Sequence, residues 1–120
     1  MVTVTWNKCD GDKWCSFENV NLSHEHFNNM AGVYVIWHGG TSPKTVRVGQ
    51  GNIAERIAAH RQDPQITKYA SLGLFVTWAK LPANQQSGVE AYLAATLNPL
   101  VGNRFPNAQQ IQVNSPFGSN

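Results

Sequence analysis

Glu90 is the acidic side chain in this sequence whose surroundings most need a chemical explanation. It is the only charged residue between Lys80 and Arg104. In a helix it would lie beside an apolar stripe formed by Val89, Leu93 and Leu97. Because removing a carboxylate from water is costly, we expect a metal ion or a distant arginine as its partner. The alternative is an ordinary solvated glutamate.

Arg56 and His60 are four residues apart, so in a helix they project from the same face. They flank an apolar stripe that contains Ile53, Ala54 and Ile57. Arginine binds phosphate through its rigid fork of donors, and histidine can donate a hydrogen bond or carry a proton. This pair therefore suits a phosphate group, while an extended surface arginine and a surface histidine remain the alternative.

Tyr34 and Arg47 lie in two short runs rich in β-branched and aromatic residues, 32–38 and 45–49. Alternation along a strand puts Tyr34 on the face opposite Val33 and Val35, and Arg47 on the face opposite Val46 and Val48. If the apolar faces lie together, Tyr34 and Arg47 share a side of the sheet. The alternative is a core tyrosine whose hydroxyl reaches water.

These five residues form a chemically coherent set for cleaving a phosphodiester bond. A carboxylate can hold one Mg²⁺ or Mn²⁺, which takes its other ligands from water and phosphate oxygens. The arginines neutralise charge on the phosphate, and a tyrosine whose pKa is lowered by cations can accept a proton from water. We expect all five on one side of the sheet, and Glu90 on the side opposite Tyr34 and Arg56 would overturn this hypothesis.

The elements that must position these residues follow the order β-β-α-β-α. The turn from Gly39 to Pro43 predicts an antiparallel hairpin, and Asn52 is the expected N-cap of a helix that runs to about Arg61. A third strand over 72–80 and a second helix over 85–98 follow. The predicted fold is α+β: a small central three-stranded antiparallel sheet flanked by helices.

Outside this core, we expect residues 1–30 to be an N-terminal extension that packs on it, residues 31–106 to form the functional domain, and residues 107–120 to be a tail. Residues 111–113 could add an edge strand. The first 30 residues carry a net charge of −2 and the remainder +4. A basic body suits a polyanionic partner such as nucleic acid, although ordinary surface charge explains it equally well.

The sequence has no apolar run near the about 20 residues that span a bilayer. Its N-terminus lacks the pattern of a secretory signal, so a cytoplasmic protein with no membrane partner is expected. Cys9 and Cys15 are then expected as free thiols. With His24 and His26 they could instead form a zinc site, although the C-x5-C spacing is looser than usual.

Several short motifs resemble the GIY-YIG nuclease family. Gly32-Val33-Tyr34 is similar to the first signature, and Arg47-Val48-Gly49, continuing as Gln50, falls at the second. Arg56-Ile57-Ala58-Ala59-His60 resembles the helix of the family, and Glu90 falls where the metal-binding glutamate belongs. Asn103 is similar to the asparagine that often closes the module. The resemblance covers about residues 31–105.

The resemblance implies a nuclease, with DNA as the expected substrate, that uses one Mg²⁺ or Mn²⁺ ion. Tyr34 would be the general base, Arg56 would stabilise phosphate with His60 assisting, and Glu90 would bind the metal. Gly49, Gln50 and Asn103 would contact substrate. Arg47 stands where the family normally has tyrosine, so it either binds phosphate and acidifies Tyr34 or marks an inactive copy.

Three hypotheses therefore remain. The active nuclease predicts that Tyr34, Arg47, Arg56, His60 and Glu90 converge, with Glu90 reachable and without an ionic partner. A catalytically drifted module that binds nucleic acid or a protein predicts that Arg47 pairs with Glu90. The third is the zinc-bound module described above. Trp6, Trp14 and Trp37 could stack on bases, but core packing is the expected use of most of them.

Overall fold

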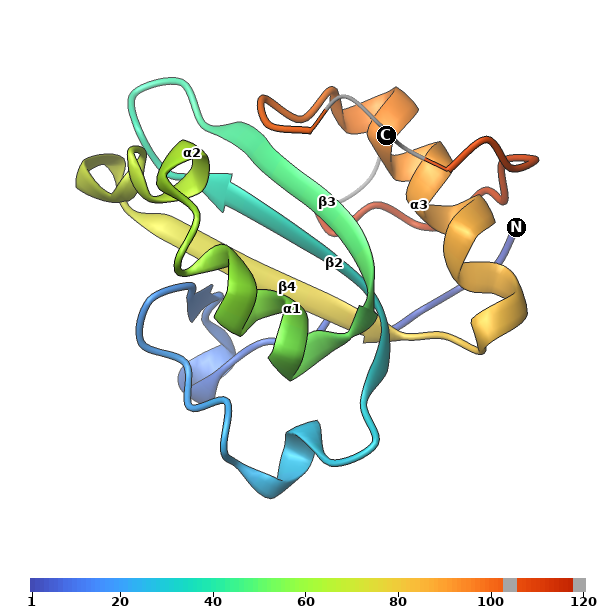
Figure 1. The fold of residues 1–120 in the computed structure, drawn as a ribbon, viewed down its shortest axis with the longest axis horizontal. Helices are drawn as coiled ribbons and strands as arrows, with labels where there is room; N and C mark the ends of the chain where they lie inside the picture. Colours follow the sequence, from blue (N-terminus) through green and yellow to red (C-terminus); the bar gives the residue numbers. More distant parts are fainter. Residues whose placement is uncertain (103–105, 118–120) are drawn as a thin grey trace.

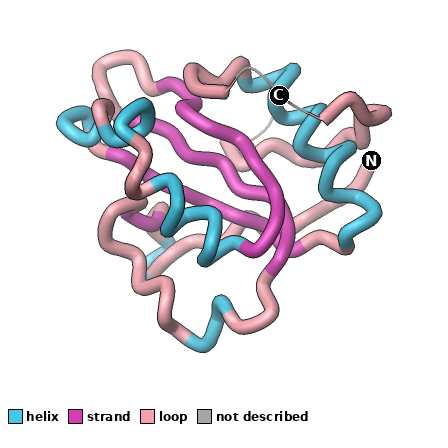
Figure 2. The backbone as a smooth tube through the Cα atoms, in the orientation of Figure 1, coloured by secondary structure: helices cyan, strands magenta, loops and turns pink. Residues whose placement is uncertain are grey.

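The computed structural model describes residues 1–102 and 106–117. The chain forms an α+β domain in which one antiparallel sheet is covered by helices and loops (Figures 1 and 2). With η denoting a 3₁₀ helix, the elements in chain order are η1 (Asp10–Asp12), β1 (Cys15–Ser16), η2 (Glu25–Phe27), β2 (Ala31–His38), β3 (Lys44–Asn52), α1 (Ile53–His60), α2 (Pro64–Thr67), η3 (Ala70–Leu72), β4 (Leu74–Lys80) and α3 (Ala83–Leu97).

The sheet has four strands in the order β1-β4-β2-β3, so the expectation of three strands was wrong. The additional strand is β1, which pairs Cys15 with Val76 and Ser16 with Phe75 of β4. A strand of two residues carries too little alternation to be recognised in a sequence. The three longer strands and their antiparallel order were predicted correctly.

The register of the central strand β2 sets the position of Tyr34. This residue pairs with Gly49 of β3 on one side and with Trp78 of β4 on the other. Cross-strand partners project from the same face of a sheet, and Arg47, which pairs with Ile36, therefore lies on the face of Tyr34 as predicted.

A shift in the β2–β3 register between Ile36 and Trp37 leaves Val46 as an extra residue in β3. Val46 consequently packs in the same core as Tyr34, whereas Val48 packs on the opposite face. The expectation that these two valines share a face was wrong, because strict alternation does not anticipate a bulge.

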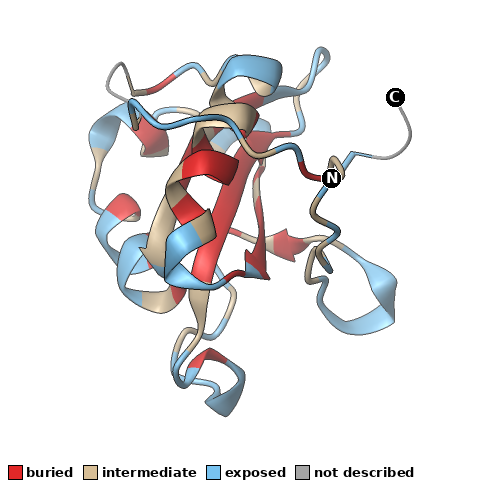
Figure 3. Cartoon of the chain, turned by 90° about the vertical axis from the view of Figure 1, so that its right-hand side faces the viewer, coloured by how far each residue is buried: buried red, intermediate tan, exposed pale blue. Residues whose placement is uncertain are grey.

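Two cores lie on the two faces of the sheet. On one face α1 contributes Ile53 and Ile57 to a core with Tyr34 and Trp78. On the other face α3 contributes Val89 and Leu93 to a core with Val33, Val35 and Val48. Figure 1 shows α1 and α3 on either side of β3, and Figure 3 shows the strands as the buried centre of the molecule. α1 and α3 therefore cover opposite faces.

The helix boundaries follow local signals in the sequence. The Asn52 side chain accepts a hydrogen bond from the backbone N–H of Glu55, which confirms the predicted N-cap of α1. Asp63 then caps a separate short helix, α2, which begins with Pro64. At its far end α3 stops at Asn98, which has a left-handed backbone with φ of 49° and precedes a proline.

The terminal segments take part in the two cores. Phe17 and Phe27 from the N-terminal segment are buried beside α1. Val2 forms an isolated parallel bridge with Val113, apart from the four-stranded sheet, so residues 111–113 do not extend that sheet. Among the described residues, no helix is long and apolar enough to cross a membrane.

Gly32 is required by the close approach of β2 and β4. A Cβ atom at this position would overlap the backbone carbonyl of Ala79, and neither strand can yield without breaking the sheet. We predict that Gly32→Ala lowers the free energy of unfolding by about 1–3 kcal/mol. Gly40→Ala is the matched control, because a Cβ there has only ordinary contacts, and it should change stability by no more than about 0.5 kcal/mol. Urea denaturation measures both, and equal effects would contradict this account.

Candidate active site

Tyr34 and His60 form a buried hydrogen-bonded pair beneath α1. The distance from the tyrosine hydroxyl to Nε2 of His60 is 2.5 Å, and the ring centroids are 5.4 Å apart. Tyr34 has no exposed surface, and 6% of the His60 surface is exposed. Gly49 makes room for this contact, because a Cβ on Gly49 would overlap the tyrosine hydroxyl. Gly49, in the motif at residues 47–49, thus leaves the space that the tyrosine hydroxyl occupies.

His60 is held in its neutral form. Burial, with smaller contributions from the charges of Arg47 and Arg56, lowers the pKa of His60 from 6.5 to about 4, while the charge of Asp63 acts in the opposite direction. A neutral imidazole has one nitrogen that donates and one that accepts a hydrogen bond. Nε2 of His60 can therefore accept a hydrogen bond from the Tyr34 hydroxyl at neutral pH.

Burial also determines the pKa of Tyr34. It raises the pKa above 10.0, although hydrogen bonding and charge from Arg56 and Arg47 act in the opposite direction. As expected, the two arginines lower the pKa of Tyr34. The expectation that this pKa is lowered overall was wrong, because the effect of burial is larger. Burial destabilises the charged form of the tyrosine by more than the two arginines stabilise it.

Arg56 and Arg47 approach this pair from α1 and β3. Arg56 is exposed on the first turn of α1, where its Cγ passes 3.5 Å from the place a Cβ on Gly51 would take. Gly51 has a φ of 121°, a conformation that favours glycine, and it leads the chain from β3 into α1. Arg47 is half-buried on β3. Both guanidinium groups affect the pKa of Tyr34, so they surround the hydroxyl.

Glu90 is buried in the middle of α3, with 6% of its surface exposed. Burial raises the pKa of its carboxyl group, whereas hydrogen bonding from Gln50 and the charges of Arg47 and Arg56 lower it. Glu90 is therefore less accessible than the active-nuclease hypothesis expects. The charge of Arg47, which the drifted-module hypothesis expects as the partner of Glu90, acts on this carboxylate.

The five residues do not share one side of the sheet, so that expectation was wrong, and the hypothesis of a site on a single face is overturned. Tyr34, Arg47 and the α1 residues lie on one face, and α3, which carries Glu90, packs on the other. The charges of Arg47 and Arg56 act on Tyr34 and His60 and also on Glu90, so a site that includes both groups has to lie around β3. The candidate site therefore lies at an edge of the sheet, as the arrangement of α1, β3 and α3 in Figure 1 allows.

The remaining candidate positions have different surroundings. Gln50 donates a hydrogen bond from Nε2 to Ser87 Oγ of α3, at 3.0 Å. Gly49 lies against Tyr34. Asn103 lies outside the described residues. Ser87 was not singled out in the sequence, because a serine in a helix carries no recognisable signal until its partner strand is known.

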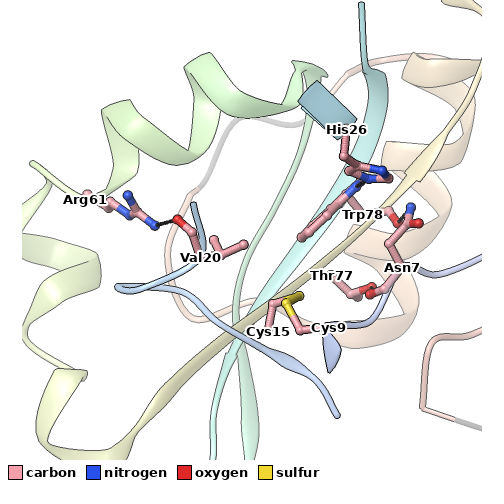
Figure 4. Close-up of a disulfide and its surroundings, with 8 residues drawn as sticks. All are labelled: Asn7, Cys9, Cys15, Val20, His26, Arg61, Thr77 and Trp78. Carbon is pink, nitrogen blue, oxygen red and sulfur yellow. Dashed lines mark hydrogen bonds between the residues drawn. A yellow bond between two sulfur atoms is a disulfide. The ribbon is translucent and has the colours of Figure 1, made fainter. Parts of the chain in front are cut away.

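The N-terminal cysteines are bonded to each other, with Cα atoms 5.1 Å apart, and are not the free thiols expected (Figure 4). Free thiols were expected because the N-terminus lacks the pattern of a secretory signal, and that argument does not consider how close the two cysteines lie. A tight loop that contains Gly11, with φ of 71°, brings them together. Bonded sulfurs are not thiolate ligands, which removes the alternative of a zinc site at these residues. His26 is engaged instead: its Nε2 accepts a hydrogen bond from Trp78 Nε1 at 3.1 Å.

The three tryptophans considered for base stacking take part in internal packing. Trp14 and Trp37 meet edge to face, with centroids 5.2 Å apart, and Trp37 stacks on Phe75. Trp6 donates a hydrogen bond from Nε1 to the backbone carbonyl of Asn114. This agrees with the expectation that most of them serve the core.

Glu90 fits a role as the single protein ligand of a hard divalent cation. In the described part of the chain, no group of three or more His, Cys, Asp or Glu side chains could hold a metal. Mg²⁺ differs from structural metals in that it often uses one or two carboxylates and completes its shell with water and phosphate oxygens. A single buried carboxylate is consistent with such a cation.

No protein-family model, curated protein or solved structure matches this chain. The resemblance to GIY-YIG nucleases accordingly rests on the short sequence motifs alone. Of the motif residues within the described chain, Tyr34, His60, Arg47, Arg56 and Glu90 are connected by contact or by charge.

The neutral state of His60 predicts a pH dependence of stability. His60 binds a proton below about pH 4 in the folded chain and below about pH 6.5 in the unfolded chain. The unfolded state therefore gains protons first as the pH falls, and stability is lost between these values. The loss attributable to His60 should be roughly 3 kcal/mol. Urea denaturation at pH 7 and pH 4 should show a smaller loss for His60→Gln than for the unaltered protein, and parallel losses would refute the assignment.

Proposed function

We propose that this protein is a divalent-metal-dependent nuclease of the GIY-YIG type that hydrolyses phosphodiester bonds in nucleic acid, with DNA as the expected substrate. The observation that supports this most strongly is the Tyr34–His60 hydrogen bond, flanked by two arginines whose charges also reach Glu90. A proton acceptor, two cations and a carboxylate are the groups that phosphodiester hydrolysis requires.

The arginines would bind the phosphate. Arg56, exposed at the start of α1, would meet it first, and the half-buried Arg47 would contact it from β3. Their guanidinium groups would neutralise the charge that builds on the phosphate oxygens during attack. The replacement of the usual tyrosine by Arg47 therefore suits phosphate binding.

Tyr34 and His60 would move the proton. Hydrolysis joins a water oxygen to phosphorus, breaks the bond from phosphorus to one ester oxygen and releases a proton from the water. Tyr34 would accept this proton as its own hydroxyl proton passes to Nε2 of His60, 2.5 Å away. A bound phosphate would offset the arginine charges that lower the pKa of His60, which makes the imidazole a better acceptor when substrate is present.

Glu90 would hold Mg²⁺ or Mn²⁺ at the β3 edge. When bound, such an ion polarises the phosphate and stabilises the leaving oxygen. Burial raises the pKa of this carboxyl group, and Gln50 and the arginines partly offset that effect, so a bound cation would have to displace a proton that burial favours.

A catalytically inactive module that binds nucleic acid or a protein is the second candidate. It is supported by the burial of Tyr34 and Glu90, which limits the access of water and substrate to both. This candidate predicts binding without cleavage, and the nuclease predicts both.

The role of Glu90 can be tested by cleavage of branched, single-stranded and duplex DNA in the presence of Mg²⁺ or Mn²⁺. We predict that Glu90→Gln, which removes the charge and keeps the shape, lowers the rate by about 100-fold or more. Glu55→Gln removes an exposed carboxylate from the first turn of α1 and should cleave normally. Equal activity of the unaltered protein and Glu90→Gln would assign the cleavage to a contaminant, and DNA binding without cleavage would favour the second candidate.

The role of Tyr34 is tested by Tyr34→Phe, which removes only the hydroxyl. We predict a loss of about 100-fold or more in kcat, because proton transfer is lost, with little change in the affinity for DNA. Tyr92→Phe, a half-buried tyrosine on α3, is the matched control. Fluorescence anisotropy with labelled DNA measures affinity, and a Tyr34→Phe protein that cleaves normally would exclude Tyr34 as the proton acceptor.

A further inference from the structure

Gln50 and Ser87 form a link between β3 and α3 that the mechanism above does not use. Nε2 of Gln50 donates to Ser87 Oγ at 3.0 Å, and the serine hydroxyl lies 3.4 Å from Oε1 of the same amide. Gln50 pairs with Val33 across the sheet and so projects from the face that α3 covers. Both side chains are only half-buried, yet they bond to each other.

Ser87 lies three residues before Glu90, so the two side chains are neighbours on the surface of α3. The Gln50–Ser87 bond therefore joins β3 to α3 at the turn of the helix that leads directly to Glu90. The bond constrains how this turn lies against β3.

The position of α3 at this turn is fixed from its other side as well. A Cβ on Gly88 would lie 2.5 Å from Cγ1 of Ile111 and 2.8 Å from the carbonyl oxygen of Gln109. The backbone N–H of Ile111 also donates to the Gly88 carbonyl oxygen at 3.0 Å. The C-terminal segment therefore holds this turn of α3 on one side, and the Gln50–Ser87 bond holds it on the other.

We infer that Gln50 is a positioning residue: its bond to Ser87 holds the turn of α3 that carries Glu90 against the edge strand β3, and so fixes where the carboxylate lies. This inference rests on the proposed function and changes one detail of it, because the resemblance implies that Gln50 contacts substrate. A positioning residue affects the carboxylate and its metal ion, whereas a substrate contact affects the binding of nucleic acid. Groups that orient a metal ligand typically contribute 10- to 100-fold in metal affinity or activity.

The test uses the folded protein without nucleic acid, and measures Mn²⁺ affinity by electron paramagnetic resonance. Gln50→Met keeps the length of the side chain and removes its amide, and Ser87→Ala removes the anchor with a residue that favours helix. Each should weaken Mn²⁺ binding by about 10-fold. The double variant should be little worse than either single variant, because both break the same link. Ser87→Thr keeps the hydroxyl and should bind Mn²⁺ normally.

Gln62→Met is the matched control, since Gln62 is exposed after the end of α1, and its Mn²⁺ affinity should be unchanged. In cleavage assays, Gln50→Met should keep its KM for DNA and lose kcat. Unchanged Mn²⁺ affinity in Gln50→Met and Ser87→Ala, or a raised KM alone, overturns the positioning role and leaves the proposed function intact. An unaltered protein that binds no Mn²⁺ overturns both. Circular dichroism establishes that each variant is folded, and Ser87→Ala carries the test if Gln50→Met does not fold.

Discussion

Burial of the Tyr34 hydroxyl is the constraint on which the site depends. A hydroxyl group removed from water must find a hydrogen-bond partner, because an unsatisfied one costs on the order of 1–3 kcal/mol. His60 supplies that partner from the end of α1, and Gly49 leaves the space in which the two atoms meet. The Tyr34–His60 contact thus depends on three features of the fold: the position of α1, the register of β2 against β3, and the absence of a side chain at Gly49.

The charges of Arg47 and Arg56 affect the pKa values of all three ionisable groups around this contact. The two arginines oppose the protonation of His60, favour the charged form of Glu90, and partly offset the effect of burial on Tyr34. With His60 neutral, the groups named here carry two positive charges and at most one negative charge. An anionic ligand would relieve the repulsion between the arginines, and this is the electrostatic basis for proposing a phosphate.

Short-range patterns in the sequence predicted the parts of the fold that local physics decides. The alternation around Tyr34 and Arg47 gave their shared face, and Asn52 gave the start of α1. The side of the sheet that α3 covers was not predictable in this way, because helical periodicity identifies an apolar stripe but not the face on which it packs. The Cys9–Cys15 bond, the bulge at Val46 and the role of Ser87 likewise depend on distances in space.

The N-terminal segment supports the site from a distance. Arg61 follows α1 directly, and its Nε donates to the carbonyl oxygen of Phe17 at 2.9 Å. Its Nη2 donates to the carbonyl oxygen of Val20 at 2.7 Å (Figure 4). This segment follows β1, which pairs with β4. The Cys9–Cys15 disulfide closes the loop that leads into β1. The end of α1 that carries His60 is therefore tied to the sheet through residues outside the expected functional domain. The segment consequently belongs to the structural support of the candidate site, and its removal would release the end of α1 on which the Tyr34–His60 contact depends.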